Sequence, residues 1–579
     1  MRTDNGNEND NDNDNDNDNG NDNENDNDNE KIQLKTIRLI WNCDRKRLVL
    51  KVVYTFVGSI LPLVNLYVLK LMVDTVTTLA ATGGQGVNML ETIGFAVLMF
   101  CGIVLVNRVI GALSTVNDDI LTQKLVDYIN KLIQEQSVSL DMAYYDNPEY
   151  HDTFHRAQQE AAYRPVRMME SIMAVFGSVV SLVGVTLMLV SASWRVIVVM
   201  VVAIIPTFCV RLYKSRTLYR FRRETTQMAR RSNYYGALLT NRSFAKEVRS
   251  FGLADHFRKL YVDIRKRLVS QLMHISRRMA VLDVLTAVVE AVAMGAVLLL
   301  LVAPVAAGVL TIGTFVMLFE AFRRGQSYLS ALVGGVSGIY EHKMFINNLF
   351  DFLNLKPSIV SPDKPKAFPS TVEEVSFDNI TFAYPDMNVP VLNHYSLTAR
   401  RGAVTLIEGE NGFGKTTMLK LLLRLYDPQE GTVRINGIDI RQFDVAELRR
   451  NVSAIFQDYV QFYFTVRENV AFGDINSPED AQRMAEAIRM ADAECVVDRL
   501  GNGLETQLGR QFQGGEELSM GQWQRVALAR QLYSRAQVLV FDEATAWMDV
   551  QGRQIFMKTV ESLKADHVVI LIRHDSGDF

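Results

Sequence analysis

The chain contains 579 residues, of which 48% are hydrophobic and 22% are charged, and its net charge at pH 7 is −4. Its mean hydropathy of +0.04 is high for a soluble protein, and a chain of this length is too long for one hydrophobic core, so two or more domains are expected. The four cysteines are scattered, with no two at the spacing of a metal or redox motif, which argues against a disulfide framework.

The N-terminal segment is strongly biased in composition. Residues 4–30 consist almost entirely of Asn, Asp, Gly and Glu, so they have nothing to bury, and we expect residues 1–30 to form a disordered tail. The tail is unlike a secretory signal peptide because it lacks a basic start and an apolar region. From Lys31 to Arg47, basic residues alternate with Ile, Leu and Trp41, which predicts an amphipathic helix at the inner membrane surface.

Long uncharged runs follow, such as Val52–Leu69 and Ser171–Trp194. A membrane helix needs about 20 largely apolar residues. The alternative, a soluble bundle of buried helices, would require a very large protein whose helices are apolar on all faces. We therefore predict an all-α transmembrane domain over residues 31–345. Its six predicted spans cover residues 49–73, 92–113, 170–193, 196–213, 280–303 and 309–333.

Lysine and arginine residues indicate the orientation of these spans. The connection Thr75–Glu91 and the turn Pro304–Gly313 contain none, whereas the segment after the fourth span is rich in them. The long connections are therefore predicted to be cytoplasmic. The same charges would suit a nucleic-acid surface, but the positive-inside bias explains them, so no nucleic acid partner is expected. The basic residues are Arg220, Arg222, Arg223, Arg230, Arg231, Arg258, Lys259, Arg265, Lys266 and Arg267.

Two connections, residues 114–168 and 212–278, are too long for simple turns and show helical periodicity. We expect membrane helices to continue through them into the cytoplasm. Each would reverse at a short segment able to touch another domain, the first around Tyr144–Pro148 and the second at Phe244–Asp255. The Asn-Pro step of the first segment is equally consistent with a helix cap.

Charged residues also occur inside the predicted spans. Asp283 and Glu290 are seven residues apart and share one helix face, and Glu320, Arg323 and Arg324 lie in the sixth span. Because burial of such groups is costly, they should face a water-filled cavity or one another. Two interpretations stay open, a structural ion pair and a lining for a transported substrate.

The C-terminal part of the chain has a different pattern. Hydropathy falls after Tyr340, and four prolines lie between Lys356 and Pro369, so residues 346–371 are predicted to form a linker. Strand and helix patterns then alternate. Residues 372–579 are therefore predicted to form one α/β domain.

Within this domain, the stretch VTLIEGENGFGKTTMLK contains a short apolar run, a glycine-rich turn and the start of a helix. It fits the pattern G-x-x-x-x-G-K-[ST], in which backbone N–H groups surround phosphate oxygens and the lysine reaches the terminal phosphates. The alternative is a glycine-rich turn before an ordinary helix. The predicted phosphate-binding residues are Gly409, Asn411, Gly412, Gly414, Lys415, Thr416 and Thr417, and the Thr416 hydroxyl is also a predicted Mg²⁺ ligand.

A second landmark is the sequence VLVFDE at residues 538–543. Four apolar residues predict a buried strand, whose end would carry two carboxylates to the Mg²⁺ of the phosphate loop. Asp542 would hold the metal, directly or through water. Glu543 would orient or deprotonate the attacking water.

Between these landmarks, the segment GGEELSMGQWQR (residues 514–525) precedes a helical VALAR sequence. With these three motifs in order, the chain from about Lys31 to its end resembles a half-transporter of the ATP-binding cassette (ABC) exporter family. The resemblance implies a multi-domain membrane protein of the type I exporter fold. A six-helix transmembrane domain would be followed by an α/β P-loop nucleotide-binding domain.

The resemblance also implies roles for single residues. Tyr384 would stack on adenine, and Gln457 would link Mg²⁺ and the attacking water to the membrane domain. Ser519 and Gly521 would close over the γ-phosphate bound by the opposite subunit. Asp549 would lie at the dimer interface.

His574 resembles the switch histidine that contacts the γ-phosphate, which gives the predicted catalytic set Glu543, Gln457 and His574. Two nucleotide-binding domains would enclose two ATP molecules with Mg²⁺, and ATP binding and hydrolysis would drive alternating access. The expected assembly is a homodimer, or alternatively a heterodimer, in contact with membrane lipid. The resemblance implies a bacterial inner (plasma) membrane, with the nucleotide-binding domain in the cytoplasm.

The chain departs from the family pattern at three places. Met520 replaces the first glycine of the signature, and Ala546-Trp547-Met548-Asp549 replaces the usual Ser-Ala-Leu-Asp. The chain ends at Phe579, where family members continue further, so a C-terminally shortened domain is expected. An alternative function is therefore that of a poorly hydrolysing partner subunit.

The cargo is indicated only by resemblance. The stretches DMAYYDNPEYHDTFHRAQQE and AKEVRSFGLADHF are similar to half-transporters that export lantibiotics, lasso peptides and related modified peptides. No cysteine peptidase domain precedes the spans, so leader cleavage by this chain is not expected. The exported substrate is predicted to be a peptide. Multidrug and lipid exporters of lipophilic small molecules share the architecture, and a soluble cassette ATPase acting on DNA or ribosomes is the third alternative.

Overall fold

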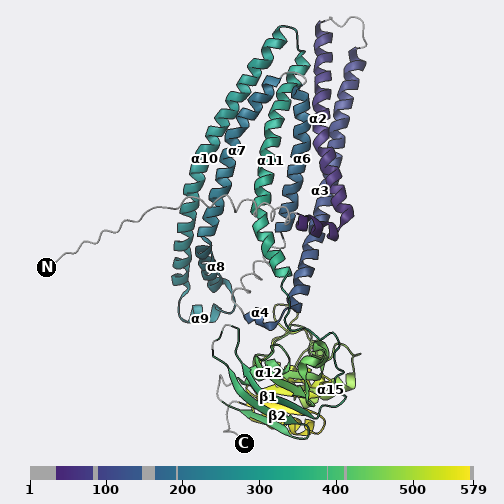
Figure 1. Cartoon of the computed structure of the whole chain (residues 1–579), viewed down its shortest axis with the longest axis vertical. Helices are drawn as coiled ribbons and strands as arrows, with labels where there is room; N and C mark the ends of the chain where they lie inside the picture. Colours follow the sequence, from purple (N-terminus) through teal and green to yellow (C-terminus); the bar gives the residue numbers. More distant parts are fainter. Residues whose placement is uncertain are drawn as a thin grey trace, which may run out of the picture. The chain divides into compact units, whose positions relative to one another are not determined.

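The computed structural model of the chain describes residues 34–81, 89–146, 163–190, 194–385, 387, 389–409 and 414–573 (Figure 1). These residues form two compact units. The first contains the described residues up to 136 and from 163 to 354, and the second contains residues 137–146 and those from 355 onward. The predicted N-terminal tail, residues 1–30, lies outside the described residues.

Six long helices make up most of the described part of the first unit. They are α2 (Arg45–Ala81), α3 (Met89–Ser139), α6 (Arg164–Val190), α7 (Trp194–Glu224), α10 (Ala254–Ala306) and α11 (Ile312–Leu353). Each predicted span coincides over most of its length with one of these helices. Four of the described helices are long and apolar enough to cross a membrane, namely α2, the Ile93–Ser139 part of α3, α6 and α10. Membrane crossing by α7 and α11 stays a prediction from the sequence.

Two of these helices are much longer than a membrane is thick. α3 has 51 residues and α10 has 53. At 1.5 Å per residue each is about 75–80 Å long, more than twice the hydrocarbon core of a bilayer. Most of the two long connections is therefore continued helix, as predicted. α8 (Thr226–Thr240) and the short α9 (Ala245–Ser250) lie at the end of the α7–α10 pair, and α9 falls within the second predicted reversal, residues 244–255 (Figure 1).

The predicted amphipathic segment also contains a helix. Residues 34–43 are helical, the helix ends before Asp44, and α2 begins at Arg45. Ile40 is 2% exposed whereas Trp41 is 41% exposed, so the helix has a covered and an open side. Its position at a membrane surface stays a prediction.

The two acidic residues of the fifth predicted span, which lie on α10, each contact a polar side chain of α7. The Lys214 ammonium lies 3.0 Å from the Asp283 carboxylate, and the Thr207 hydroxyl donates to Glu290 Oε1 at 3.0 Å. For Asp283, the contact favours the structural ion pair over the substrate-lining interpretation.

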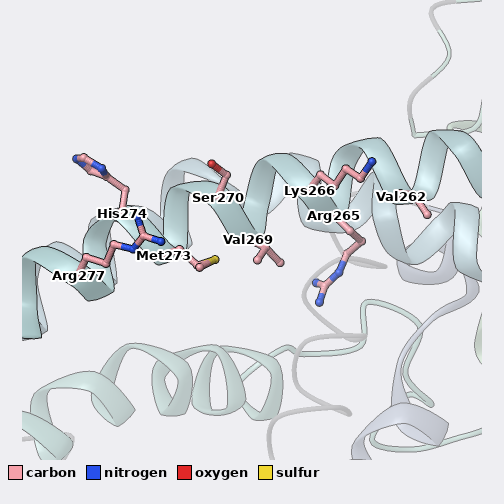
Figure 2. Close-up of a pocket in the computed structure, with 8 residues that line it drawn as sticks. All are labelled: Val262, Arg265, Lys266, Val269, Ser270, Met273, His274 and Arg277. Carbon is pink, nitrogen blue, oxygen red and sulfur yellow. The ribbon is translucent and has the colours of Figure 1, made fainter.

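Below its predicted membrane span, α10 carries a basic face. An open surface hollow of about 490 Å³ is lined by eight residues of α10, whose side chains are drawn in Figure 2. Arg265, Lys266, His274 and Arg277 are among these residues, and none of the four forms an ion pair within the described part of the chain. An excess of unpaired positive charge at this end of α10 agrees with the predicted cytoplasmic orientation.

The second unit contains two sheets. The antiparallel sheet has the strand order β2–β1–β4–β5 and consists of β1 (Glu374–Phe382), β2 (Leu392–Arg400), β4 (Glu430–Ile435) and β5 (Ile438–Asp439). The parallel sheet has the order β3–β8–β7–β6 and consists of β3 (Val404–Glu408), β6 (Val452–Ile455), β7 (Val538–Asp542) and β8 (Val568–Arg573). Every residue of β7 is buried, as expected for a strand covered on both faces.

Helices pack on these sheets around two apolar cores. One core joins the antiparallel sheet to the parallel sheet and α12 (Lys415–Leu422). The other core joins the parallel sheet to helices that include α15 (Ala481–Met490), α17 (Met520–Tyr533) and α18 (Val550–Leu563). Further helices are α13 (Val445–Asn451), α14 (Val466–Ala471) and α16 (Glu494–Val497), with 3₁₀ turns at Ile440–Gln442 and Gly503–Glu505. The α/β architecture predicted for this part of the chain is present.

The predicted linker, residues 346–371, begins as helix, because α11 continues to Leu353, and from residue 355 on it belongs to the second unit. The Arg424 guanidinium donates to the Val360 carbonyl at 3.1 Å, and the Ser361 hydroxyl donates to the Asp444 carboxylate at 2.8 Å. Residues 356–369 form no helix, yet their backbone and side chains are fixed by these bonds. Proline content predicted the absence of helix but not the attachment.

Glycine allows a close approach between α6 and α11. A Cβ added at Gly335 would lie 2.7 Å from the Val175 Cγ2 atom and 3.0 Å from the Ser171 carbonyl oxygen. A Cβ added at the neighbouring Gly334 would meet only the Arg211 Nη1 atom, at an ordinary 3.6 Å. The same change at two adjacent positions should therefore have opposite effects.

We expect Gly335→Ala to destabilise the protein by about 1–3 kcal/mol, because the new methyl group overpacks a backbone contact. Gly334→Ala is the matched control and should be neutral or stabilising, since alanine is the better helix former. Thermal unfolding in lipid nanodiscs measures both. Equal melting temperatures for the two variants would contradict the packing argument.

Candidate nucleotide-binding site

The phosphate-loop sequence lies between strand β3 and helix α12. Gly414 is the N-cap residue of α12 and has φ +77°, a conformation that favours glycine. A Cβ at this position would also lie 2.6 Å from the Leu392 Cδ2 atom. The strand and the helix predicted from the sequence are therefore present on the two sides of the loop. Asn411 and Gly412 lie outside the described residues.

Lys415 is held at the carboxyl ends of two neighbouring strands. Its ammonium donates to the carbonyl of Gly409, just after β3, at 2.6 Å and to the carbonyl of Arg573, the last residue of β8, at 2.9 Å. The residue is 8% exposed. An ammonium group has three donors, so one N–H remains for an oxygen ligand at this edge.

Asp542, the last residue of β7, faces the same edge. Its Oδ2 atom accepts a hydrogen bond of 2.8 Å from the Thr416 hydroxyl, and the residue is 2% exposed. Burial raises the pKa of Asp542 and the charge of Glu543 adds to the rise, while the hydrogen bond from Thr416 opposes it. A cation at this position would relieve the cost of the buried charge.

The oxygen atoms of Thr416 and Asp542 are too few to bind Mg²⁺ alone, but they fit Mg²⁺ together with phosphate oxygens. Within the described residues, no cluster of three or more His, Cys, Asp or Glu side chains can hold a metal. Mg²⁺ is commonly bound by one or two carboxylates plus substrate phosphates and water. The Thr416 and Asp542 oxygens supply that smaller set.

Glu543 has a strained backbone. Its φ is +51°, which is unfavourable for a residue with a side chain. The backbone N–H donates to the Ile572 carbonyl at 3.1 Å, and the carboxylate accepts a bond of 2.8 Å from Gln457 Nε2. These contacts hold the Glu543 carboxylate beside Gln457, so two of the predicted catalytic residues are in direct contact.

Tyr384 lies close to α12. Its hydroxyl is 3.0 Å from the Thr417 hydroxyl, and the Lys420 ammonium lies 5.0 Å from its ring centroid. An edge contact with Tyr426 fixes the ring further. The aromatic residue predicted to meet adenine is therefore next to the phosphate-loop helix.

Ser519, Gly521 and Asp549 form a second group. Ser519 is the N-cap of α17, in a capping box with Gln522. A Cβ on Gly521 would lie 2.7 Å from the Trp547 carbonyl oxygen, and Asp549 caps α18. Within the described residues, these three side chains make no hydrogen bond to the first group around Lys415 and Asp542. His574 lies outside the described residues.

Two residues near Met520 were not predicted. The Tyr459 hydroxyl donates to the Met520 carbonyl at 2.7 Å, and Gln461 Nε2 lies 3.3 Å from the Met520 sulfur. Both follow Gln457 in sequence, so one segment connects the Glu543 partner with the signature helix. No motif marks these residues.

Arg530 of α17 contacts the segment that follows Gln457. It donates to the Asn469 carbonyl at 3.0 Å and to Asn469 Oδ1 at 2.8 Å, and its guanidinium lies 4.6 Å from the Phe462 ring centroid. Burial lowers the pKa of Arg530 to about 10, so it is still charged at neutral pH. An arginine within a helix carries no sequence pattern that reveals this contact.

The first predicted reversal contacts the nucleotide-binding fold. Helix α4 (Met142–Asp146) belongs to the second unit, and Ala143 packs against its core. The Tyr426 hydroxyl donates to Asp146 Oδ2, and burial together with this carboxylate raises the pKa of Tyr426. Of the predicted reversal segment, residues 147–148 lie outside the described residues.

Asp141, just before α4, binds the start of the predicted linker. Its carboxylate accepts hydrogen bonds from the Ser358 backbone N–H at 2.5 Å, the Ser358 hydroxyl at 2.6 Å and the Ile359 N–H at 3.2 Å. Asp141 is 7% exposed. This aspartate therefore ties α4 to the segment that leads into β1.

Comparison with known families gives two successive matches. Residues 48–325 match the family described as ABC transporter transmembrane region, and residues 392–546 match the family described as ABC transporter. Together these matches cover most of the chain and agree with the resemblance seen in its motifs.

Related proteins match over nearly the whole length. The subtilin transport ATP-binding protein of Bacillus subtilis is 26% identical over 544 residues, which are 93% of this chain and 87% of that protein. The nisin transport ATP-binding protein of Lactococcus lactis subsp. lactis is 24% identical over 93% of this chain and 88% of its own length. An ATP-dependent lipid A-core flippase of Vibrio vulnificus is 24% identical over 82% of this chain and 80% of that protein.

The fold is also that of a solved exporter. The structure of a bacterial Atm1-family ABC exporter with ATP bound covers 92% of this chain and 91% of its own, with a TM-score of 0.73 and 20% sequence identity. The family matches, the relatives and the phosphate-loop geometry agree. The chain therefore belongs to the ABC transporters, as an ATP-binding and ATP-hydrolysing exporter half-transporter of the membrane.

Proposed function

We propose that this exporter moves a modified peptide across a bacterial plasma membrane, with its nucleotide-binding domain in the cytoplasm. The observation that carries the proposal is the similarity to the subtilin and nisin transport proteins over 93% of the chain. It includes both the helical and the nucleotide-binding parts. Lipid export is the second candidate because lipid A-core flippases match over more than four fifths of the chain.

The first group of site residues would bind ATP with Mg²⁺. Lys415 would turn its ammonium toward the terminal phosphates, and Thr416 and Asp542 would hold Mg²⁺, which offsets the negative charge of the phosphates. Gly409, Gly414 and Thr417 would complete the phosphate loop with Asn411 and Gly412. Tyr384 would contact the adenine ring.

Glu543 would act on the attacking water. Its carboxylate is 2.8 Å from Gln457 Nε2, so the glutamine orients the base and can also act as a metal partner. His574 would contact the γ-phosphate. The left-handed backbone of Glu543 sets the direction of its Cα–Cβ bond, and the hydrogen bond from Gln457 holds its carboxylate.

The second group would act on the nucleotide of a second subunit. Ser519 is exposed, and Asp549 has a side-chain exposure of 70%, so both are open to a second chain. Two copies arranged with these residues against the opposite phosphate loop would enclose two ATP molecules. The proposed assembly is a homodimer embedded in lipid, with a heterodimer as the alternative.

The first prediction concerns hydrolysis. In lipid nanodiscs, Glu543→Gln should lower ATPase turnover by about 10²–10⁴-fold while ATP binding persists, because general base catalysis is removed and the phosphate contacts stay. Glu561→Gln is the matched control, since Glu561 is exposed and pairs only with Lys564. Turnover above half of the wild-type rate in Glu543→Gln would contradict the assignment of the base.

The same preparation tests the cargo. Subtilin and nisin, added in turn, should raise Glu543-dependent turnover more than lipid A does. Stimulation by lipid A alone would favour the lipid exporter. Absence of turnover in the wild-type protein, with ATP bound, would favour a poorly hydrolysing partner subunit.

The second prediction concerns the buried carboxylate. Asp542→Asn should raise the melting temperature of the nucleotide-free protein by about 2–4 °C at pH 7.5, since a buried charge is removed. Because the folded-state pKa is raised, the wild-type residue is destabilising when ionised, so the difference should shrink as the pH falls and Asp542 takes up a proton.

In the presence of ATP and Mg²⁺, the same variant should lose most of the stabilisation that the wild type gains. Asp498→Asn, at an exposed aspartate, is the control and should change neither quantity. A lower melting temperature of Asp542→Asn without nucleotide would show that the Thr416 bond outweighs the desolvation cost.

The third prediction concerns the signature. Met520 is 44% exposed and its sulfur contacts Gln461, which draws the side chain toward its own subunit. We therefore expect Met520→Gly to leave maximal ATPase turnover within about twofold, less than 0.5 kcal/mol in barrier. A tenfold gain in turnover would instead mean that the thioether obstructs the partner nucleotide, and would support the weak-subunit alternative.

A further inference from the structure

Three charged residues of α11 form one cluster. Arg323 donates from Nε to Glu320 Oε2 at 2.8 Å and from Nη2 to Glu320 Oε1 at 2.7 Å, so the pair is bidentate. Arg324 donates from Nε to the same Oε1 atom at 3.1 Å and from Nη1 to the Pro62 carbonyl of α2 at 3.5 Å. One carboxylate therefore serves two guanidinium groups, and the cluster keeps one net positive charge.

Arg323 is the most exposed member of the cluster. The Glu320 and Arg324 side chains are 20% and 29% exposed, whereas that of Arg323 is 59% exposed. Arg324 also contacts a second helix through Pro62. Among the described residues, Glu320 is the one carboxylate paired with Arg323.

The depth of Arg323 makes this exposure costly. It lies eleven residues after Ile312, the first residue of α11, which corresponds to about 16 Å along the helix. That is close to half the thickness of a bilayer core, so the cluster lies near the middle of the predicted sixth span. A partly exposed guanidinium at this depth must face water or a ligand rather than lipid.

The ion pair between Asp283 and Lys214 differs from this cluster. Asp283 is matched one to one by Lys214, and that pair joins two helices. The α11 cluster lies on one helix, which packs against α2, α6, α7 and α10. A purely structural role would be met by one arginine and one glutamate. The second arginine leaves a charge for another purpose.

The geometry of the guanidinium indicates which ligand fits. Glu320 occupies the Nε and Nη2 donors, which leaves the Nη1 edge of Arg323 free for a second planar acceptor. A carboxylate matches this fork with two hydrogen bonds. We propose that Arg323 binds a carboxylate of the transported molecule in the membrane part of the exporter, and so selects cargo with an acidic group.

The proposal rests on the proposed function for the peptide nature of the cargo. The test therefore uses two probe pairs with protein in nanodiscs. One pair is an apolar fluorescent hexapeptide with a free C-terminal carboxylate and its C-terminal amide. The other pair is dansyl-undecanoic acid and its methyl ester. Equilibrium binding of each probe gives a ratio of affinities for the acid and neutral forms.

For the wild type, we expect the acid form of either pair to bind about tenfold more tightly than its neutral partner, the size of a charge-assisted hydrogen bond. Arg323→Gln should bring the ratio close to one. Arg323→Lys should restore part of the preference, because it keeps the charge but loses the fork. Arg277→Gln, which removes an unpaired exposed cation of α10, should keep the wild-type ratio.

The two proposals fail in different ways. Binding of the acidic amphiphile but of neither peptide, with a preference lost in Arg323→Gln, would support the carboxylate site and reject the peptide cargo. Equal binding of acid and neutral forms by the wild type would overturn the carboxylate site. So would an acid preference unchanged in Arg323→Gln, even if that variant melts at a lower temperature.

Discussion

The nucleotide-binding unit depends on the hydrogen bond between the Thr416 hydroxyl and the buried Asp542 carboxylate. This bond joins the end of β7 to the start of α12, the two elements that have to stay in register for a metal and phosphates to be bound together. Asp542 is 2% exposed and the next residue, Glu543, has a left-handed backbone. Two consecutive residues therefore reduce the stability of the fold, Asp542 through the burial of its carboxylate and Glu543 through its strained backbone. A fold without a ligand would need neither.

Helix α12 connects this chemistry to α4. Its first residues, Lys415 and Thr416, meet the strand ends, and the chain just after it carries Tyr426, which bonds to Asp146 of α4. The helix has eight residues and is about 12 Å long. The short helix and residues 423–425 therefore separate the strand ends from Tyr426. Asp141 adds a second attachment by binding residues 358 and 359.

Local sequence patterns predicted the helices and strands, because these depend mainly on neighbouring residues. Apolar periodicity after the glycine-rich stretch predicted α12, four apolar residues predicted buried β7 with Asp542 at its end, and hydropathy predicted the long helices. Contacts between distant positions were not predictable. Tyr426 and Asp146 are 280 positions apart, and Ser358 and Asp141 are 217 apart. Such pairs arise from tertiary packing, which leaves no periodicity in either segment. The roles of Ser519, Gly521 and Asp549 stay predictions, since they depend on a second subunit.

The charges of the predicted spans show the limit of a helical-wheel argument. Periodicity placed Asp283 and Glu290 on one helix face, and Glu320, Arg323 and Arg324 lie in the sixth predicted span. The sequence left the same two interpretations open for both sets. The two sets differ in the number of oppositely charged residues that contact each carboxylate. Asp283 meets one lysine on a neighbouring helix, and the two charges cancel. Glu320 meets two arginines, and only one of them can be neutralised. An unpaired charge is expensive in a membrane, so the surplus guanidinium has to face water or a ligand, and the proposed carboxylate of the cargo would supply that ligand.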